Sequence, residues 1–209
     1  MKARTAVDFG LVITFALSAM GSACRETTST AHPASSAATQ TISTISTEQY
    51  SVYELPSVWR NQHGDTLHLS ALTGHVRVMA MVYANCHATC PLVISELKRI
   101  EDRFPENPHN NVRFVLVSLD PSRDTPESLS KWAASLGLDP ARWTLLTGTA
   151  DGVRELTIAL NVRYQSQQNG ELAHTNALTV LDSSGHVVHQ QTELGQTTET
   201  FRQLRKLLQ

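Results

Sequence analysis

The sequence predicts an α/β sandwich in which helices flank a mixed central sheet. Two nearly continuous apolar runs, 76–82 and 112–118, are typical of strands that are covered on both faces. Segments with apolar residues at helical spacing follow both runs, so strands and helices alternate along the chain. A hydrophobic content of 41% is sufficient for a packed core.

The remaining elements follow from turn and capping signals. Turn-rich residues 62–65 separate two short strand-like segments and predict an N-terminal hairpin. Val93, Leu97, Ile100 and Phe104 lie on one face of a helix over 91–104. Further elements are expected as follows: a helix that starts with an N-cap at Thr125 and ends near Gly137, a strand at 143–146, a helix at 150–160, a loop at 165–171, a hairpin of 176–181 with 187–190, and a helix at 198–208.

Charge and cysteine content exclude some functional classes. The net charge of −2 gives no basic footprint for nucleic acid. Three cysteines are too few for a disulfide-rich scaffold, and the odd number requires a separate role for one of them. The sequence has no GxGxxG or Walker-type loop, so nothing in it indicates nucleotide binding.

The N-terminal segment has the pattern of an export signal. Lys2 and Arg4 precede an apolar stretch of about a dozen residues, which is short for a membrane span of about 20. We expect a signal peptide at 1–23, a flexible Ser/Thr/Ala-rich tether at 24–49 and a folded domain at 50–209. Cys24 occupies the position of a lipoprotein's acylated cysteine, although the preceding Gly-Ser-Ala is an imperfect lipobox. An uncleaved anchor, or cleavage that leaves Cys24 free, is the alternative.

Cys86 and Cys90 are the strongest chemical signal. They lie between the first buried strand and its helix, and Pro91 places Cys90 at the helix N-terminus. Free N–H groups and positive potential at a helix N-terminus lower the pKa of thiols. The two thiols could form a disulfide or bind one soft metal ion. The alternatives are two packed cysteines or a purely structural disulfide.

Two of the nine histidines could reach this pair. His87 lies inside the cysteine loop, and we expect it to be exposed or to support the site from outside the ligand set. His174 precedes a strand, from which it could reach the mouth of the neighbouring strand–helix loop. Spacing alone is weak evidence that His174 is a ligand.

Several segments together resemble the Sco/SenC family of thioredoxin-like copper proteins. They are CHATCP at 86–91, VSLDPSRDTPE at 117–127, RWTLLTG at 142–148, NVRY at 161–164 and AHTNALTVLDSSG at 173–185. A typical thioredoxin lacks the second segment and has two residues between its cysteines. The resemblance implies a thioredoxin-like core with extra N-terminal strands and an inserted hairpin. It also implies that Cys86, Cys90 and His174 bind one copper ion, as Cu(I), Cu(II) or both.

The chain also departs from the family pattern inside the cysteine loop. The commonest loop has Pro and an acidic residue after the first cysteine, where this chain has His87 and Ala88. The departure makes the loop less negative and offers His87 as a competing ligand. Asp120 begins the segment after the second strand, and we expect it to fix a loop near the site by capping or by pairing with Arg123.

The leading functional hypothesis is a metallochaperone of the bacterial cell envelope. The resemblance implies delivery of copper to a respiratory oxidase, or reduction of the cysteines at its copper site. A thiol reductant protein is a further expected partner, and a lipid or anchor would tether the chain on the periplasmic side of a membrane. The alternatives are a thiol–disulfide oxidoreductase, which needs only Cys86 and Cys90, and a copper or redox sensor.

Overall fold

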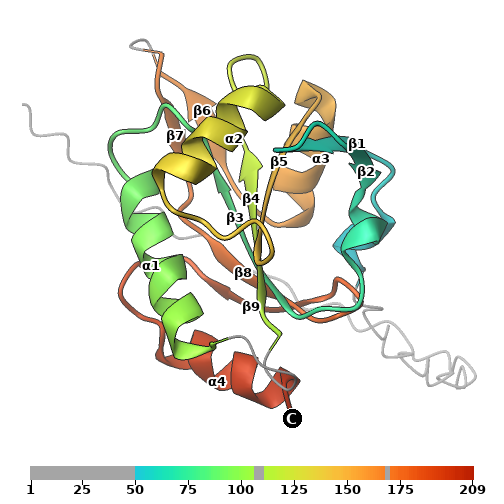
Figure 1. Cartoon of the computed structure of the whole chain (residues 1–209), viewed down its shortest axis with the longest axis vertical. Coiled ribbons are helices and arrows are strands. Elements are labelled where there is room, and N and C mark those ends of the chain that lie inside the picture. The colour runs from blue at the N-terminus through green and yellow to red at the C-terminus, as the bar shows by residue number, and fades with distance from the viewer. Residues whose placement is uncertain (1–49, 106–110, 168–169) are drawn as a thin grey trace, which may run out of the picture. The chain divides into compact units, whose positions relative to one another are not determined.

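The computed structural model describes residues 50–105, 111–167 and 170–209 (Figure 1). The helices are α1 (Cys90–Arg103), α2 (Pro126–Ser135), α3 (Ala150–Ala159) and α4 (Thr198–Leu207), with short 3₁₀ turns η1 (Val52–Glu54) and η2 (Leu69–Leu72). The strands are β1 (Val58–Asn61), β2 (Thr66–His68), β3 (Arg77–Val82), β4 (Arg113–Ser118), β5 (Trp143–Gly148), β6 (Tyr164–Ser166), β7 (Leu172–His174), β8 (Leu178–Leu181) and β9 (Val187–Gln191). The predicted signal peptide, Cys24 and the tether lie outside the described residues.

Seven strands form one mixed sheet in the order β2-β1-β5-β4-β3-β8-β9. The central strands β3, β4 and β5 run parallel, whereas β8 pairs with β3 in the antiparallel sense. Strands β6 and β7 form a separate antiparallel hairpin. The expected sandwich, with a mixed sheet, an N-terminal hairpin and an inserted hairpin, is confirmed.

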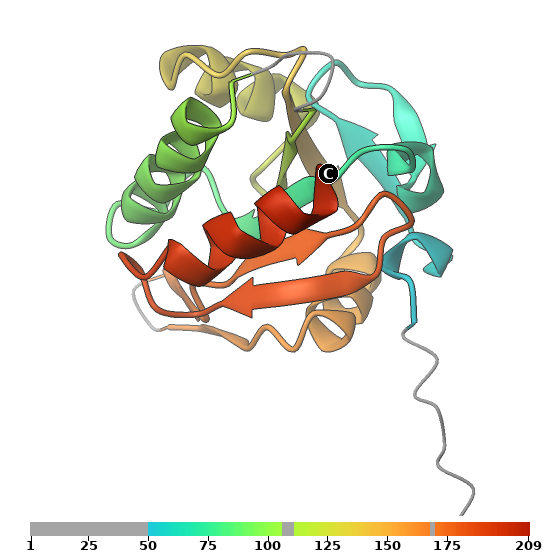
Figure 2. The ribbon, with the colours of Figure 1, turned by 90° about the horizontal axis from the view of Figure 1, so that it is seen from below.

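Alternating residues of the buried strands supply two cores, one on each face of the sheet. Val78 and Ala80 of β3 belong to a cluster that also contains apolar residues of α1, α2 and α4. Met79 and Met81 belong to a second cluster, shared with α3 and the N-terminal 3₁₀ turns. Figure 2 shows α4 lying along the face of β8 and β9. Coverage of both faces explains why the runs in β3 and β4 are nearly continuously apolar.

The differences from the predicted boundaries are small and local. Helix α1 begins at Cys90 itself, with Pro91 in the first turn, where its missing N–H costs no hydrogen bond. The segment predicted as a loop at 165–171 instead contributes to β6, since Tyr164–Ser166 pairs with Leu172–His174. Its polar composition conceals the strand because both strands are short and partly exposed. Within the described residues, no helix has the length and hydropathy needed to cross a bilayer.

Side-chain capping distinguishes α2 from α1. The Thr125 hydroxyl oxygen accepts a hydrogen bond from the Ser128 N–H at 3.2 Å, as its N-cap position predicts. Thr89 precedes α1 but makes no side-chain capping bond. The two threonines therefore form a matched pair for testing the contribution of the cap.

We predict that Thr125→Ala lowers the free energy of unfolding by about 1 kcal/mol, because the Ser128 N–H in the first turn of α2 loses its acceptor. Thr89→Ala is the control and should change it by less than about 0.5 kcal/mol. Chemical denaturation followed by circular dichroism measures both values. Equal losses in the two variants would contradict the capping account.

Candidate metal centre

The cysteine loop connects the carboxyl end of β3 to the first turn of α1. Cys86 lies in a tight turn in which its N–H donates to the Tyr83 carbonyl oxygen at 3.2 Å. The Cys90 N–H, at the start of the helix, donates to the Cys86 sulfur at 3.4 Å. The first N–H of the helix therefore donates to the first thiol.

Three potential ligand atoms converge at this loop. The sulfurs of Cys86 and Cys90 and a ring nitrogen of His174 all lie within 4.8 Å of one another. The Cys90 sulfur is 3.6 Å from His174 Nε2, although the two residues are 84 positions apart in the sequence. His174 is the last residue of β7, so the inserted hairpin brings the imidazole to the thiols.

A backbone hydrogen bond orients the imidazole. His174 Nδ1 lies 3.2 Å from the Thr175 carbonyl oxygen, which can only accept, so Nδ1 carries the proton. The lone pair then lies on Nε2, the nitrogen that faces Cys90. Burial lowers the pKa of His174, and the bond to Thr175 opposes that shift only in part. The ring is therefore neutral at pH 7 and has a free donor atom toward the thiols.

The two thiols have opposite electrostatic environments. Burial by itself would raise the pKa of Cys86, but hydrogen bonds from the Cys90 thiol, the N–H groups of Cys90 and Ala88, and the Tyr83 hydroxyl lower it to about 7. Burial raises the pKa of Cys90 far above its usual range, and the charge of Cys86 adds to that rise. Cys86 is 8% exposed and Cys90 is 0% exposed, so Cys86 is also the more accessible thiol.

The segment after β4 contacts both halves of the site. Arg123 pairs with Asp120, as expected, and its Nη2 donates to the Gly170 carbonyl oxygen at 3.0 Å, which links this segment to the inserted hairpin. Asp124 contacts the cysteine loop, since its Oδ2 accepts the Ala84 N–H at 3.1 Å and the Ser118 hydroxyl at 2.5 Å. No role for Asp124 is predicted from the sequence, although it lies in the segment 117–127 that carries the family resemblance.

His87 occupies a different position from His174. It is exposed and does not belong to the cluster of converging ligand atoms.

Tyr83 is a second residue for which the sequence predicts no role, and it lies at the centre of the site. Its position three residues before Cys86, as a polar aromatic residue at the end of an apolar strand, was the available signal.

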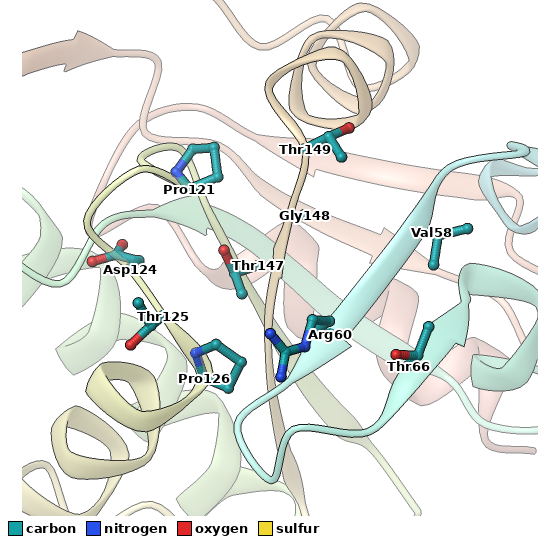
Figure 3. A pocket seen from close by; sticks show the side chains of 10 residues that line it. All are labelled: Val58, Arg60, Thr66, Pro121, Asp124, Thr125, Pro126, Thr147, Gly148 and Thr149. Atoms are coloured by element: carbon teal, nitrogen blue, oxygen red, sulfur yellow. The ribbon is translucent and has the colours of Figure 1, made fainter.

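Two cavities differ in position and chemistry, and one of them adjoins the cysteine loop. A cleft of about 250 Å³ between the loop and β7 is lined by Cys86, Thr89 and His174 among others. A cavity of about 450 Å³ lies between the β1–β2 hairpin and the segment after β4, with Arg60 and Asp124 in its wall (Figure 3). Only the cleft has soft ligand atoms in its wall.

The donor set of the cleft suits a soft metal ion. Two thiolates and one neutral imidazole match the preferences of Cu(I) and are also compatible with Cu(II). The hydrogen bond at Nδ1 is the kind of outer contact that fixes the orientation of a metal-binding histidine. The residues present therefore fit a bound copper ion.

Part of the chain is similar to a curated protein. The curated SCO1 protein homolog of Bacillus subtilis is 31% identical over 97 residues, which cover 46% of this chain and 50% of that protein. The chain thus matches only half the length of this relative.

Solved structures match over most of the described fold. A SCO1/SenC family lipoprotein from Bacillus anthracis has a TM-score of 0.64 and 23% identity, covering 76% of this chain and 96% of that one. Copper-bound ScoI from Arabidopsis thaliana has a TM-score of 0.64 and 18% identity, covering 73% and 97%. BsSco, a member of the Sco family of cytochrome c oxidase assembly proteins with an identified disulfide switch, has a TM-score of 0.66 and 21% identity, covering 77% and 95%.

These structural likenesses establish the thioredoxin-like fold expected from the sequence. The family model described as SCO1/SenC matches residues 50–209, which is more than half of the chain. With the cysteine pair, the distant histidine and the fold in agreement, the chain belongs to the SCO1/SenC family.

Proposed function

We propose that the protein binds one copper ion through Cys86, Cys90 and His174 and transfers it to a copper site of a respiratory oxidase during assembly. The observation that supports this most directly is the convergence of the three ligand atoms within 4.8 Å. The copper-bound relative and the relative described as a cytochrome c oxidase assembly protein support the same proposal.

The position of His174 favours metal binding over thiol chemistry alone. Disulfide exchange requires two sulfurs and an access path, and an imidazole with a free nitrogen contributes nothing necessary to it. Here the free Nε2 lies 3.6 Å from the buried sulfur of Cys90, and Nδ1 is held by a backbone carbonyl. A neutral imidazole fixed in this way has a nitrogen available to bind a metal ion.

The site is also accessible to a partner protein. His87 and Ala88, between the two cysteines, are exposed, and Leu92 in the first turn of α1 is 57% exposed. An exposed apolar side chain beside a cleft gives a partner a contact surface close to the metal ligands. We propose that the oxidase subunit docks on this face.

We predict that the reduced protein takes up one Cu(I) per chain and that His174→Ala weakens binding by about tenfold or more, since even losing an outer contact to a ligand costs 10–100-fold. Cys86→Ser and Cys90→Ser should cost more than His174→Ala, because thiolates are the softer ligands. Competition against a chromogenic Cu(I) chelator measures the affinities. His87→Ala, at an exposed position, is the control. A loss of Cu(I) affinity in His87→Ala but not in His174→Ala would show that His174 is not the ligand.

A second candidate function is thiol–disulfide exchange with a partner, either alone or before metal transfer. The observation that favours it is the unequal pair of thiols, one accessible with a lowered pKa and one fully buried. Such a pair resembles an attacking and a resolving cysteine. A reversible Cys86–Cys90 disulfide belongs to both functions.

We predict that iodoacetamide alkylates Cys86 much faster than Cys90 in the reduced protein. The thiolate is the reactive form, so the rate should fall below pH 7 and level off above it, as the pKa of about 7 requires. A Cys24→Ser background leaves only the two site thiols, and mass spectrometry of the peptides identifies the product. Equal rates at the two cysteines would refute the assignment of an attacking thiol.

We further propose that Cys24 is lipidated and holds the protein on the periplasmic side of a membrane. The relative from Bacillus anthracis is a lipoprotein, and the residues before Cys24 are small. We predict that Cys24→Ser releases a soluble or unprocessed form, as seen by membrane fractionation and mass spectrometry. Ser22→Ala, which retains the acceptor cysteine and a small residue, is the control. Membrane association of Cys24→Ser without a change in mass would contradict lipidation.

A further inference from the structure

Tyr83 contacts all three candidate ligand residues. Its carbonyl oxygen accepts the Cys86 N–H at 3.2 Å, and its own N–H donates to the Cys90 sulfur. Its ring meets the His174 ring edge-on, with centroids 6.1 Å apart and planes at 74°. Tyr83 is 3% exposed and belongs to the core cluster that contains both cysteines, so the fold fixes its position.

The hydroxyl of Tyr83 joins the two halves of the site. It accepts the N–H of Leu172 at 3.2 Å, across 89 positions of sequence, and donates to the Cys86 sulfur. Leu172 starts β7 and His174 ends it, so this bond ties the strand that carries the imidazole to the cysteine loop. One phenol thus connects the cysteine loop to the histidine hairpin through a donor and an acceptor contact.

The hairpin owes its position to contacts with the main domain. Strands β6 and β7 contain three residues each and, within the described residues, pair with one another. A two-stranded hairpin is at best marginally stable in isolation. Leu172 and Tyr164 pack against the apolar cores of the main domain, and side-chain bonds from Tyr83 and Arg123 add to this packing.

We infer that the Tyr83 hydroxyl is a positioning group that holds hairpin β6–β7 against the cysteine loop and so keeps His174 within ligand distance of the two sulfurs. The effect of Tyr83 on copper affinity rests on the proposed function. The contact between Tyr83 and Leu172 does not involve metal, so it can be tested without copper.

Tyr83→Phe removes only the hydroxyl and retains the ring in the core. We expect the Leu172 amide of the metal-free protein to exchange at least about fivefold faster, because it loses its acceptor. We expect the Cu(I) affinity to fall about tenfold, as for other losses of outer contacts. Exchange followed by NMR and competition with a Cu(I) chelator give the two values.

Tyr164→Phe is the matched control. Tyr164 lies opposite His174 in the hairpin, and its hydroxyl makes no hydrogen bond within the part of the chain that the structure describes. It should match the parent in Leu172 exchange and in Cu(I) affinity. An equal loss in both variants would show general loosening of the hairpin and overturn the assignment to Tyr83.

A double-mutant cycle with His174→Ala tests whether Tyr83 acts through the imidazole. In that background Tyr83→Phe should change the Cu(I) affinity by less than about twofold, because the imidazole that the hydroxyl positions is already absent. The effects of two mutations that act through one group do not add. An undiminished tenfold effect would mean that the hydroxyl acts on Cys86 alone, and it would overturn the positioning of His174. If the parent binds no Cu(I), the proposed function fails, whereas unchanged exchange at Leu172 in Tyr83→Phe would refute the Tyr83 contact independently.

Discussion

The antiparallel pairing of β8 with β3 is the constraint on which the site depends. Their register ends with Ala80 opposite Leu178, so the chain leaves β3 and enters β8 at the same end of the strands. The cysteine loop follows β3 at this end, and the segment that carries His174 precedes β8. The parallel neighbour β4 adds its own loop there, with Asp120, Arg123 and Asp124. Sheet topology therefore brings three distant segments together before any side chain interacts.

The two halves of the site are held by different forces. Cys86 and Cys90 are part of the apolar cluster under α1, so packing fixes the sulfurs with the precision of a core. His174 lies on a two-stranded hairpin outside the main sheet, held by hydrogen bonds such as Thr175 N–H to the Arg163 carbonyl at 2.9 Å. The hairpin also packs against the cores through Leu172 and Tyr164, so the imidazole is placed by a few contacts and the thiols by the core itself.

The sequence was sufficient for the central sheet and for the cysteine pair, because both depend on local signals. Apolar runs defined β3 and β4, and Thr125-Pro126 defined the start of α2. His174 could not be identified from spacing, since its proximity to Cys90 arises from the β3–β8 pairing, and only the family resemblance indicated it. Tyr83 and Asp124 were missed because their roles consist of contacts to Leu172 and Ala84 across the fold. The strand β6 was missed because three partly exposed polar residues give no periodicity.

In the proposed function the same two sulfurs would serve metal binding and disulfide formation, and the two uses exclude one another. A Cys86–Cys90 disulfide consumes both thiols and releases two electrons and two protons to an oxidant, so it leaves only His174 as a ligand. Metal binding also requires both thiols to lose their protons, but it keeps the electrons on sulfur. Cys90 is buried and its charged form is disfavoured there, so either a cation or a sulfur–sulfur bond must replace the lost proton. The imidazole favours only the first of these outcomes, because its free nitrogen adds a bond to a metal and none to a disulfide. If copper binding is the function, the redox state of the pair determines whether His174 can act as a ligand.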